Sequence, residues 1–255
     1  MRIQYCSDLH FNFQSNVEFI LKSPLKYVGD ILILAGDTTF LNYHEREFER
    51  QFFKTLSDNY KYVFYLIGNS EFYGGVNCKI IETPFFKKIF HNFFVVNNYC
   101  TTIDSCTIIF TTLWSHINDE NKAIIKNNSH DFEYIRYDNK PISEALYNRF
   151  HAQATTFINN KLKNINTKTT IVVSHFLPSM LCSSDKWKGN PLNDVFVANM
   201  DDIIINNKID YWIYGHSHEN MPPIYLGNTV LLTNQFAESY NDNKIPFNNT
   251  AYIDV

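Results

Sequence analysis

The chain has 255 residues, of which 45% are hydrophobic and 16% aromatic, and it carries a formal net charge of −4. These numbers suit a single α/β domain over residues 1–255, and the charge gives no electrostatic reason for stable binding to nucleic acid or to a membrane surface. The sequence has no apolar run of about 18 residues that could span a membrane, and five scattered cysteines without a C-x-x-C pair favour a cytoplasmic protein with reduced thiols.

The predicted strands, taken in chain order, have one feature in common. Each is an apolar run that ends in a side chain able to bind a metal ion. Five such runs end, in chain order, at Asp8 with His10, at Asp37, at Asn69, at His175, and at His216 with His218. Because Asp8 and His10 are two residues apart, we expect both side chains to leave the first strand on the same side. Open α/β sheets bind ligands at the carboxyl ends of their strands, so the repetition predicts one shared site there.

Helices are predicted between the first strands. One is expected within residues 11–28, and the aromatic residues at helical spacing in 48–56 indicate a second. Thr83-Pro84 resembles an N-cap followed by proline at the first helical position, which predicts a third helix between residues 76 and 91.

The second half of the chain continues the mixture of strands and helices. The predicted elements are a strand at 93–96, a hairpin at 101–114 that turns at Asp104-Ser105, a long helix opened by Ser143, a helix around 195–206, a hairpin at 224–232 that turns at Gly227-Asn228, and a last strand at 250–255.

Residues 115–140 form a polar segment without hydrophobic periodicity. A loop of this length in a compact chain is usually functional, so we expect it to cover the site and to lack a core of its own. Its acidic residues Asp119, Glu120, Asp131 and Glu133 are interpreted as a solvated face rather than as metal ligands.

The seven candidate ligands combine imidazole nitrogens with carboxylate and amide oxygens. Such a mixed set suits two divalent metal ions, with Mn, Fe, Zn, Ni and Co all open as identities. A pair of ions about 3.5–4 Å apart, bridged by one carboxylate, can activate a water and hold the phosphoryl oxygens around it. Since neither thiol ligands nor a glycine-rich nucleotide loop accompany these residues, the chemistry indicated is hydrolysis at phosphorus.

In these motifs the sequence resembles the calcineurin-like metallophosphoesterase superfamily, and in particular a bacterial-type branch of small single-domain members. The blocks that carry the resemblance are Asp8-Leu9-His10, Gly36-Asp37, Gly68-Asn69-Ser70-Glu71, Ser174-His175 and Gly215-His216-Ser217-His218. They follow one another in the superfamily's order. The resemblance implies an α/β fold, a four-layer α/β/β/α sandwich of two mixed sheets flanked by helices, with two metals at one edge.

The resemblance also implies a role for each ligand. Asp8, His10 and His218 would hold one ion, and Asn69, His175 and His216 would hold the other. Asp37 would bridge the two ions and take part in catalysis. Gly36, Gly68 and Gly215 are expected to allow tight turns that swing the ligands inward.

One position departs from the superfamily pattern. Ser70 stands where a histidine usually contacts the phosphate and can protonate the leaving oxygen. Serine is a poor acid at neutral pH, so His116, at the start of the polar segment, is a second candidate for the proton donor. The function expected is hydrolysis of a small phosphomonoester or phosphodiester, with nucleotides among the candidate substrates, by a metal-activated hydroxide. The alternative is a weakly active or non-catalytic metal-binding scaffold or sensor on the same fold.

Overall fold

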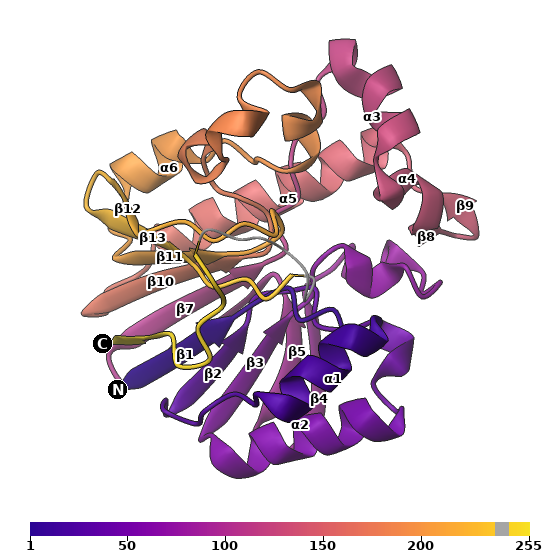
Figure 1. Cartoon of the computed structure of the whole chain (residues 1–255). Coiled ribbons are helices and arrows are strands. Elements are labelled where there is room, and N and C mark those ends of the chain that lie inside the picture. The colour runs from indigo at the N-terminus through magenta and orange to yellow at the C-terminus, as the bar shows by residue number, and fades with distance from the viewer. Residues whose placement is uncertain (238–244) are drawn as a thin grey trace.

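The computed structural model describes residues 1–237 and 245–255. Two six-stranded mixed sheets lie face to face between helices, with the first and last strands adjacent (Figure 1). The first sheet contains, in spatial order, β14 (Tyr252–Asp254), β1 (Arg2–Cys6), β2 (Ile31–Leu34), β3 (Tyr62–Leu66), β5 (Phe93–Asn97) and β4 (Phe85–Phe90). The second contains β12 (Ile224–Leu226), β13 (Thr229–Thr233), β11 (Tyr211–Tyr214), β10 (Thr169–Ser174), β7 (Cys106–Thr111) and β6 (Tyr99–Ile103).

The central strands of each sheet are parallel, which brings their carboxyl ends to one edge. In the first sheet β1, β2, β3 and β5 run parallel, and β14 and β4 are antiparallel partners at the two sides. In the second sheet β7, β10, β11 and β13 run parallel, with β6 and β12 antiparallel. All five strands that precede a candidate ligand belong to these parallel sets.

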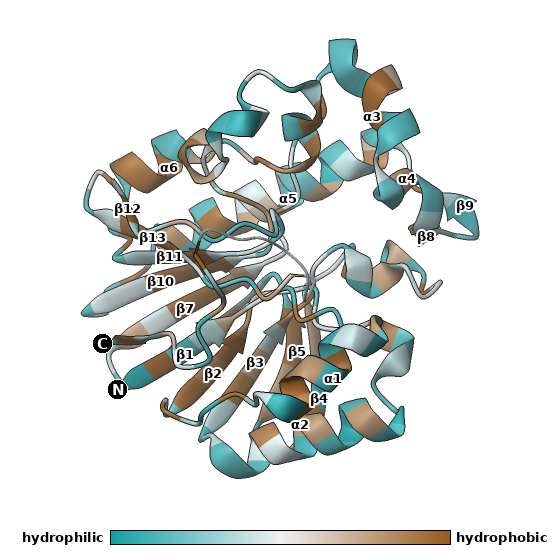
Figure 2. Cartoon of the chain, viewed as in Figure 1, coloured by the Kyte–Doolittle hydropathy of each residue, from teal (hydrophilic) through white to brown (hydrophobic). Residues whose placement is uncertain are grey.

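Alternation along the strands separates an inner core from an outer one. In β2, Ile31 and Ile33 are buried in the cluster shared by the two sheets, whereas Leu32 and Leu34 belong to the cluster packed under the helices. The rings of Phe64 on β3 and Phe110 on β7 stack with centroids 5.0 Å apart, which joins the two sheets directly. The central strands are accordingly hydrophobic on both faces (Figure 2).

Helices cover the outer face of each sheet. The first sheet lies under α1 (Gln14–Lys22) and α2 (Glu47–Asn59), and the second lies under α5 (Glu144–Leu162) and α6 (Asp201–Asn206) (Figure 1). The aromatic stripe of α2 is core, as its Phe53 ring packs 5.0 Å from that of Phe93 on β5. These layers confirm the four-layer α/β/β/α sandwich. None of the helices in the described ranges has the length and apolar character needed to cross a membrane.

The polar segment 115–140 is more structured than expected. It contains α3 (Lys122–Asn128), α4 (His130–Tyr134) and β8 (Arg136–Tyr137), and β8 pairs with β9 (Lys140–Pro141). Ile125 and Ile135 are fully buried, so the segment does contribute apolar contacts to the core. The expectation of a loop without a core pattern was wrong, because these anchors are too few and too widely spaced to produce a visible period.

Two helix predictions also need correction. Residues 85–90, expected to follow Thr83-Pro84 as a helix, form β4, where Phe86 stacks on Phe94 of β5 at 5.2 Å. Here cross-strand aromatic contact outweighed a local capping pattern. The helix expected around 195–206 begins only at Asp201. By contrast, Ser143 does cap α5, since its hydroxyl accepts a hydrogen bond from the Leu146 amide.

Candidate metal centre

The candidate ligands lie where the parallel strands of both sheets end. Asp8 and His10 follow β1, Asp37 follows β2 and Asn69 follows β3; from the second sheet, His175 follows β10, and His216 and His218 follow β11. The two sheets therefore contribute to one site, as the repeated strand endings predicted.

Many of these residues adopt a backbone conformation that side chains normally avoid. The φ angle is positive at Asp8 (57°), His10 (46°), Asp37 (53°), His216 (76°) and His218 (56°). Such left-handed residues are uncommon outside glycine and cluster at functional sites. Asp8 and His10 thus point into the site because of a left-handed turn after β1 has ended. From the sequence we expected them to share a side through the alternation of side chains along the strand, and that explanation was wrong.

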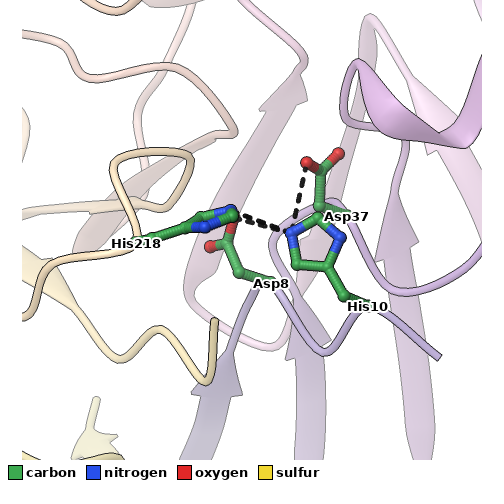
Figure 3. Close-up of side chains that lie close together, drawn as sticks. All are labelled: Asp8, His10, Asp37 and His218. Atoms are coloured by element: carbon green, nitrogen blue, oxygen red, sulfur yellow. Dashed lines mark hydrogen bonds and ion pairs between the residues drawn. The ribbon is translucent and has the colours of Figure 1, made fainter. Parts of the chain in front are cut away.

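The first cluster consists of Asp8, His10, Asp37 and His218 (Figure 3). One ligand atom from each of these residues lies within 4.8 Å of all the others. The Nε2 atoms of His10 and His218 are 2.9 Å apart, and the His218 Nε2 atom lies 3.6 Å from Asp8 Oδ1. The His218 side chain is 34% exposed, whereas those of Asp8 and His10 are buried, so His218 is the member of this cluster most open to solvent.

The second cluster consists of Asp37, His175 and His216, whose ligand atoms also lie within 4.8 Å of one another. Asn69 joins it, because its Oδ1 atom is 3.0 Å from His175 Nε2. Asp37 belongs to both clusters through different oxygens: Oδ2 is 3.7 Å from His10 Nε2, and Oδ1 is 3.3 Å from His175 Nε2. Its carboxylate is therefore placed to bridge two cations.

Hydrogen bonds to backbone carbonyls fix which nitrogen of each buried histidine faces the cluster. The His175 ring donates from Nδ1 to the Ala35 carbonyl at 2.9 Å, and the His216 ring donates from Nε2 to the Val195 carbonyl at 2.9 Å. The ring nitrogens that face the cluster are consequently His175 Nε2, which lies 3.0 Å from Asn69 Oδ1, and His216 Nδ1. Metal-binding histidines characteristically use their second ring nitrogen in this way, so the donor set fits a metal pair.

Glu71 anchors the turn that carries Asp37. Its carboxylate accepts hydrogen bonds from the amides of Asp37, Thr38 and Gly68 at 2.7–3.0 Å and from the Tyr65 hydroxyl at 2.6 Å. Burial and the nearby Asp37 charge raise the pKa of Glu71 to about 8. The residue is fully buried and ties β3 to the turn after β2, so it supports the Asp37 carboxylate.

The charge environment of the site favours a cation. Burial lowers the pKa of His216 to about 3, which leaves its ring neutral and able to bind a metal. Burial also opposes a charge on His175, but the Asp37 carboxylate outweighs it and raises the pKa of His175 to about 10. The Asp37 carboxylate thus favours a positive charge at the position of the His175 ring.

Three glycines make room for the ligands. A Cβ atom would lie 2.4 Å from His175 Nδ1 at Gly36, 2.2 Å from Asp37 Oδ1 at Gly68 and 2.6 Å from Asp8 Oδ2 at Gly215. Only Gly36 has a positive φ, 94°. The tight-turn explanation expected from sequence thus holds for Gly36, whereas Gly68 and Gly215 are needed for space.

Sequence reasoning missed Asp131. Interpreted as part of a solvated face, it is in fact 2% exposed, and its carboxylate accepts hydrogen bonds from Asn69 Nδ2, the Tyr73 hydroxyl and the Tyr147 hydroxyl. Nothing in the local sequence marks this acid apart from the buried Phe132 beside it. Asp131 links the 115–140 segment to the candidate metal centre.

The two proposed proton donors lie in different surroundings. Ser70 is 5% exposed, and its amide donates to Asp37 Oδ1 at 3.0 Å, which places it beside the bridging carboxylate. His116 is exposed, and among the described residues its contacts are with Asn148 and His151. Proton donation by either residue stays a prediction.

A four-layer sandwich with two buried Asp/His clusters that share a carboxylate defines a metallophosphoesterase-type protein with a possible dimetal site. Residues 1–220 match the family described as Calcineurin-like phosphoesterase, and the chain belongs to this family.

The chain is also similar to a curated relative and, in fold, to solved structures. The chain is 29% identical to the uncharacterized protein L509 of Acanthamoeba polyphaga mimivirus, over all of this chain and 97% of that protein. It is similar in fold to the phosphopantetheinyl hydrolase of Mycobacterium tuberculosis, with a TM-score of 0.66, 16% identity and coverage of 92% of this chain and 89% of that one. A dimetal phosphatase from Danio rerio gives a TM-score of 0.51 at 13% identity, with coverage of 92% and 87%. The assignment to a bacterial-type branch stays an expectation.

Proposed function

We propose that this protein is a binuclear metal-dependent phosphoesterase that hydrolyses a small phosphomonoester or phosphodiester. The observation that carries the proposal is the position of Asp37, whose two oxygens face histidines of different clusters. A carboxylate shared in this way suits a pair of cations held side by side.

The residues divide between two binding positions. Asp8, His10 and His218 would hold one ion, Asn69, His175 and His216 the other, and Asp37 both. When bound, such a pair lowers the pKa of a water molecule and neutralises the charge of a phosphoryl group.

The chain itself keeps this site rigid and partly dry. Glu71 holds the Asp37 turn through three backbone amides, and the carbonyls of Ala35 and Val195 hold the rings of His175 and His216. Such fixed orientation lowers the cost of arranging charges during reaction. The complete set of donor residues also favours an enzyme over a scaffold that has lost its ligands.

The substrate is proposed to be small, and no stable partnership with nucleic acid or membrane is expected. A cytoplasmic location is proposed as well, supported by five free cysteines, of which Cys6, Cys78, Cys106 and Cys182 are buried.

The test is metal-dependent hydrolysis. Protein stripped with a chelator is titrated with Mn²⁺, Zn²⁺, Ni²⁺, Co²⁺ or Fe²⁺, and its activity should rise until two metal ions per chain have been added. The substrate panel contains aryl phosphates, mononucleotides, cyclic nucleotides, dinucleotides and a phosphopantetheinyl compound. Asp37→Asn should abolish this gain, whereas Asp58→Asn, the same change at an exposed position, should keep it. Equal activity of the stripped and the loaded protein would contradict the proposal.

A further inference from the structure

Asp131 is a buried acid that accepts three hydrogen bonds, one of them from the metal-ligand candidate Asn69. Its Oδ1 atom accepts from Asn69 Nδ2 at 2.8 Å and from the Tyr73 hydroxyl at 2.8 Å, and its Oδ2 atom accepts from the Tyr147 hydroxyl at 3.1 Å. The three donors come from the turn after β3 and from α5, and Asp131 itself stands on α4. Side chains from three separate parts of the chain thus hold this carboxylate in place.

An amide side chain has two ends of nearly the same shape, and only one end can bind a cation. Both oxygens of Asp131 already accept hydrogen bonds from tyrosine hydroxyls, so the end of Asn69 that faces Asp131 is the one that donates, its NH₂ group. The opposite end, Oδ1, is then directed at the second cluster, 3.0 Å from His175 Nε2. Turned round, Asn69 would place two N–H donors where a cation needs an oxygen.

We propose that Asp131 is a positioning residue, which fixes the Asn69 amide with its oxygen toward the second metal position. The inference rests on the proposed function, because it concerns how the same metal centre is assembled. It also gives the 115–140 segment a role in that assembly, since this segment supplies the carboxylate.

The first experiment measures Mn²⁺ binding to chelator-stripped protein by titration calorimetry. Asp131→Asn keeps the shape of the side chain but allows it to donate to Asn69, so that both orientations of Asn69 become possible. We expect one of the two sites to weaken by roughly 10- to 100-fold, the range typical for residues that orient a metal ligand, while the other changes by less than about threefold.

The matched control is Glu133→Gln, which removes the same charge from the same helix at a position 61% exposed. It should leave both sites unchanged. The melting temperature of each metal-free variant is measured alongside, because a residue that only supports the fold would lower this temperature and weaken both sites together.

A charge swap separates orientation from packing. Asn69→Asp alone places two carboxylates against each other and should weaken the second site strongly. The double variant Asn69→Asp with Asp131→Asn again places one hydrogen-bond donor against one acceptor. Its second site should bind Mn²⁺ at least about tenfold more tightly than that of Asn69→Asp alone, which a packing role would not give. The double variant also decides the matter if Asp131→Asn alone fails to fold, because it retains the hydrogen-bonded pair.

The outcomes distinguish this inference from the proposed function. If the wild-type protein binds fewer than two Mn²⁺ ions, the proposed function fails, and the role of Asp131 fails with it. If the wild type binds two ions and Asp131→Asn binds both equally tightly, only the positioning role is overturned. A double variant that is no better than Asn69→Asp would overturn it as well.

Discussion

A buried histidine outside the metal centre makes the stability of the fold depend on pH. His44 is 4% exposed, its ring packs against those of Phe53 and Tyr65, and neither ring nitrogen has a hydrogen-bond partner in the described part of the chain. Burial, with a smaller contribution from Lys87, lowers the pKa of His44 from 6.5 to about 4. The folded protein therefore holds this ring neutral at a pH where the unfolded chain already binds a proton.

The sign and size of the effect follow from linkage. Because the folded pKa is lower than the unfolded one, the unfolded state takes up protons first, and stability falls as the pH drops below 6.5 toward 4. Each unit of difference corresponds to about 1.4 kcal/mol, so between pH 7 and pH 5 His44 alone should cost about 2 kcal/mol of unfolding free energy. In addition, its unpaired ring nitrogens should destabilise the fold at every pH, by about 1 kcal/mol or more.

The perturbation is His44→Leu, which replaces the imidazole with an apolar side chain of similar size and removes the ionisable group. Urea unfolding of chelator-stripped protein at pH 7 and pH 5 gives the free energy of each variant, and the other titrating groups cancel in the comparison. We expect His44→Leu to be more stable than the wild type at pH 7 and to widen its advantage by about 2 kcal/mol at pH 5. His91→Leu, at an exposed histidine, should show no such widening. An advantage of His44→Leu that stays the same at both pH values would refute the reasoning.

Further predictions concern the metal centre. Asp37→Asn should deplete both ions together, whereas His218→Ala should deplete mainly one; metal analysis showing full occupancy in both would contradict the bridging role. Gly68→Ala should lose metal because its Cβ would lie 2.2 Å from Asp37 Oδ1, whereas Gly189→Ala, which meets no atom but has a φ of 73°, should lose only about 1 kcal/mol of stability and keep its metal. Wild-type turnover of substrates with alkyl or nucleoside leaving groups should trail that of aryl esters by roughly 10²- to 10⁴-fold if no general acid acts, and Ser70→His should restore more rate on the poor leaving groups. Equal gains on both classes would mean that position 70 only binds phosphate.

The sequence carried most of the information about the family and the layers, for a physical reason. Strands buried on both faces appear as continuous apolar runs, such as 31–35 and 62–67, and the motif residues stand immediately after them. Parallel strands of one sheet bring their carboxyl ends to one edge, so the meeting of Asp8, Asp37 and Asn69 follows from the strand order. That His175 joins them depends on how the second sheet packs against the first.

Features that depend on tertiary contacts could not be predicted in this way. On β4, Phe86 meets Phe94 of the neighbouring strand β5 and Tyr99 of β6 in the second sheet, contacts that no local capping pattern reveals. Asp131 is buried because Asn69 and Tyr147, 62 and 16 residues away in sequence, converge on it. The left-handed turns that aim the ligands fall on aspartate and histidine, which tolerate this conformation better than most residues, but the strand pattern does not show where they occur.

The division of the site between the two sheets has a consequence for synthesis of the chain. The ribosome synthesises Asp8, Asp37 and Asn69 early. His218, which belongs to the cluster of Asp8 but follows a strand of the opposite sheet, is added more than two hundred residues after Asp8. Until then, the site residues that follow β1, β2 and β3 lack the histidines that follow β10 and β11. The strand β1 also lacks its neighbour β14. On the proposed function, full occupancy of both ion positions therefore requires that the two halves of the chain have folded against each other.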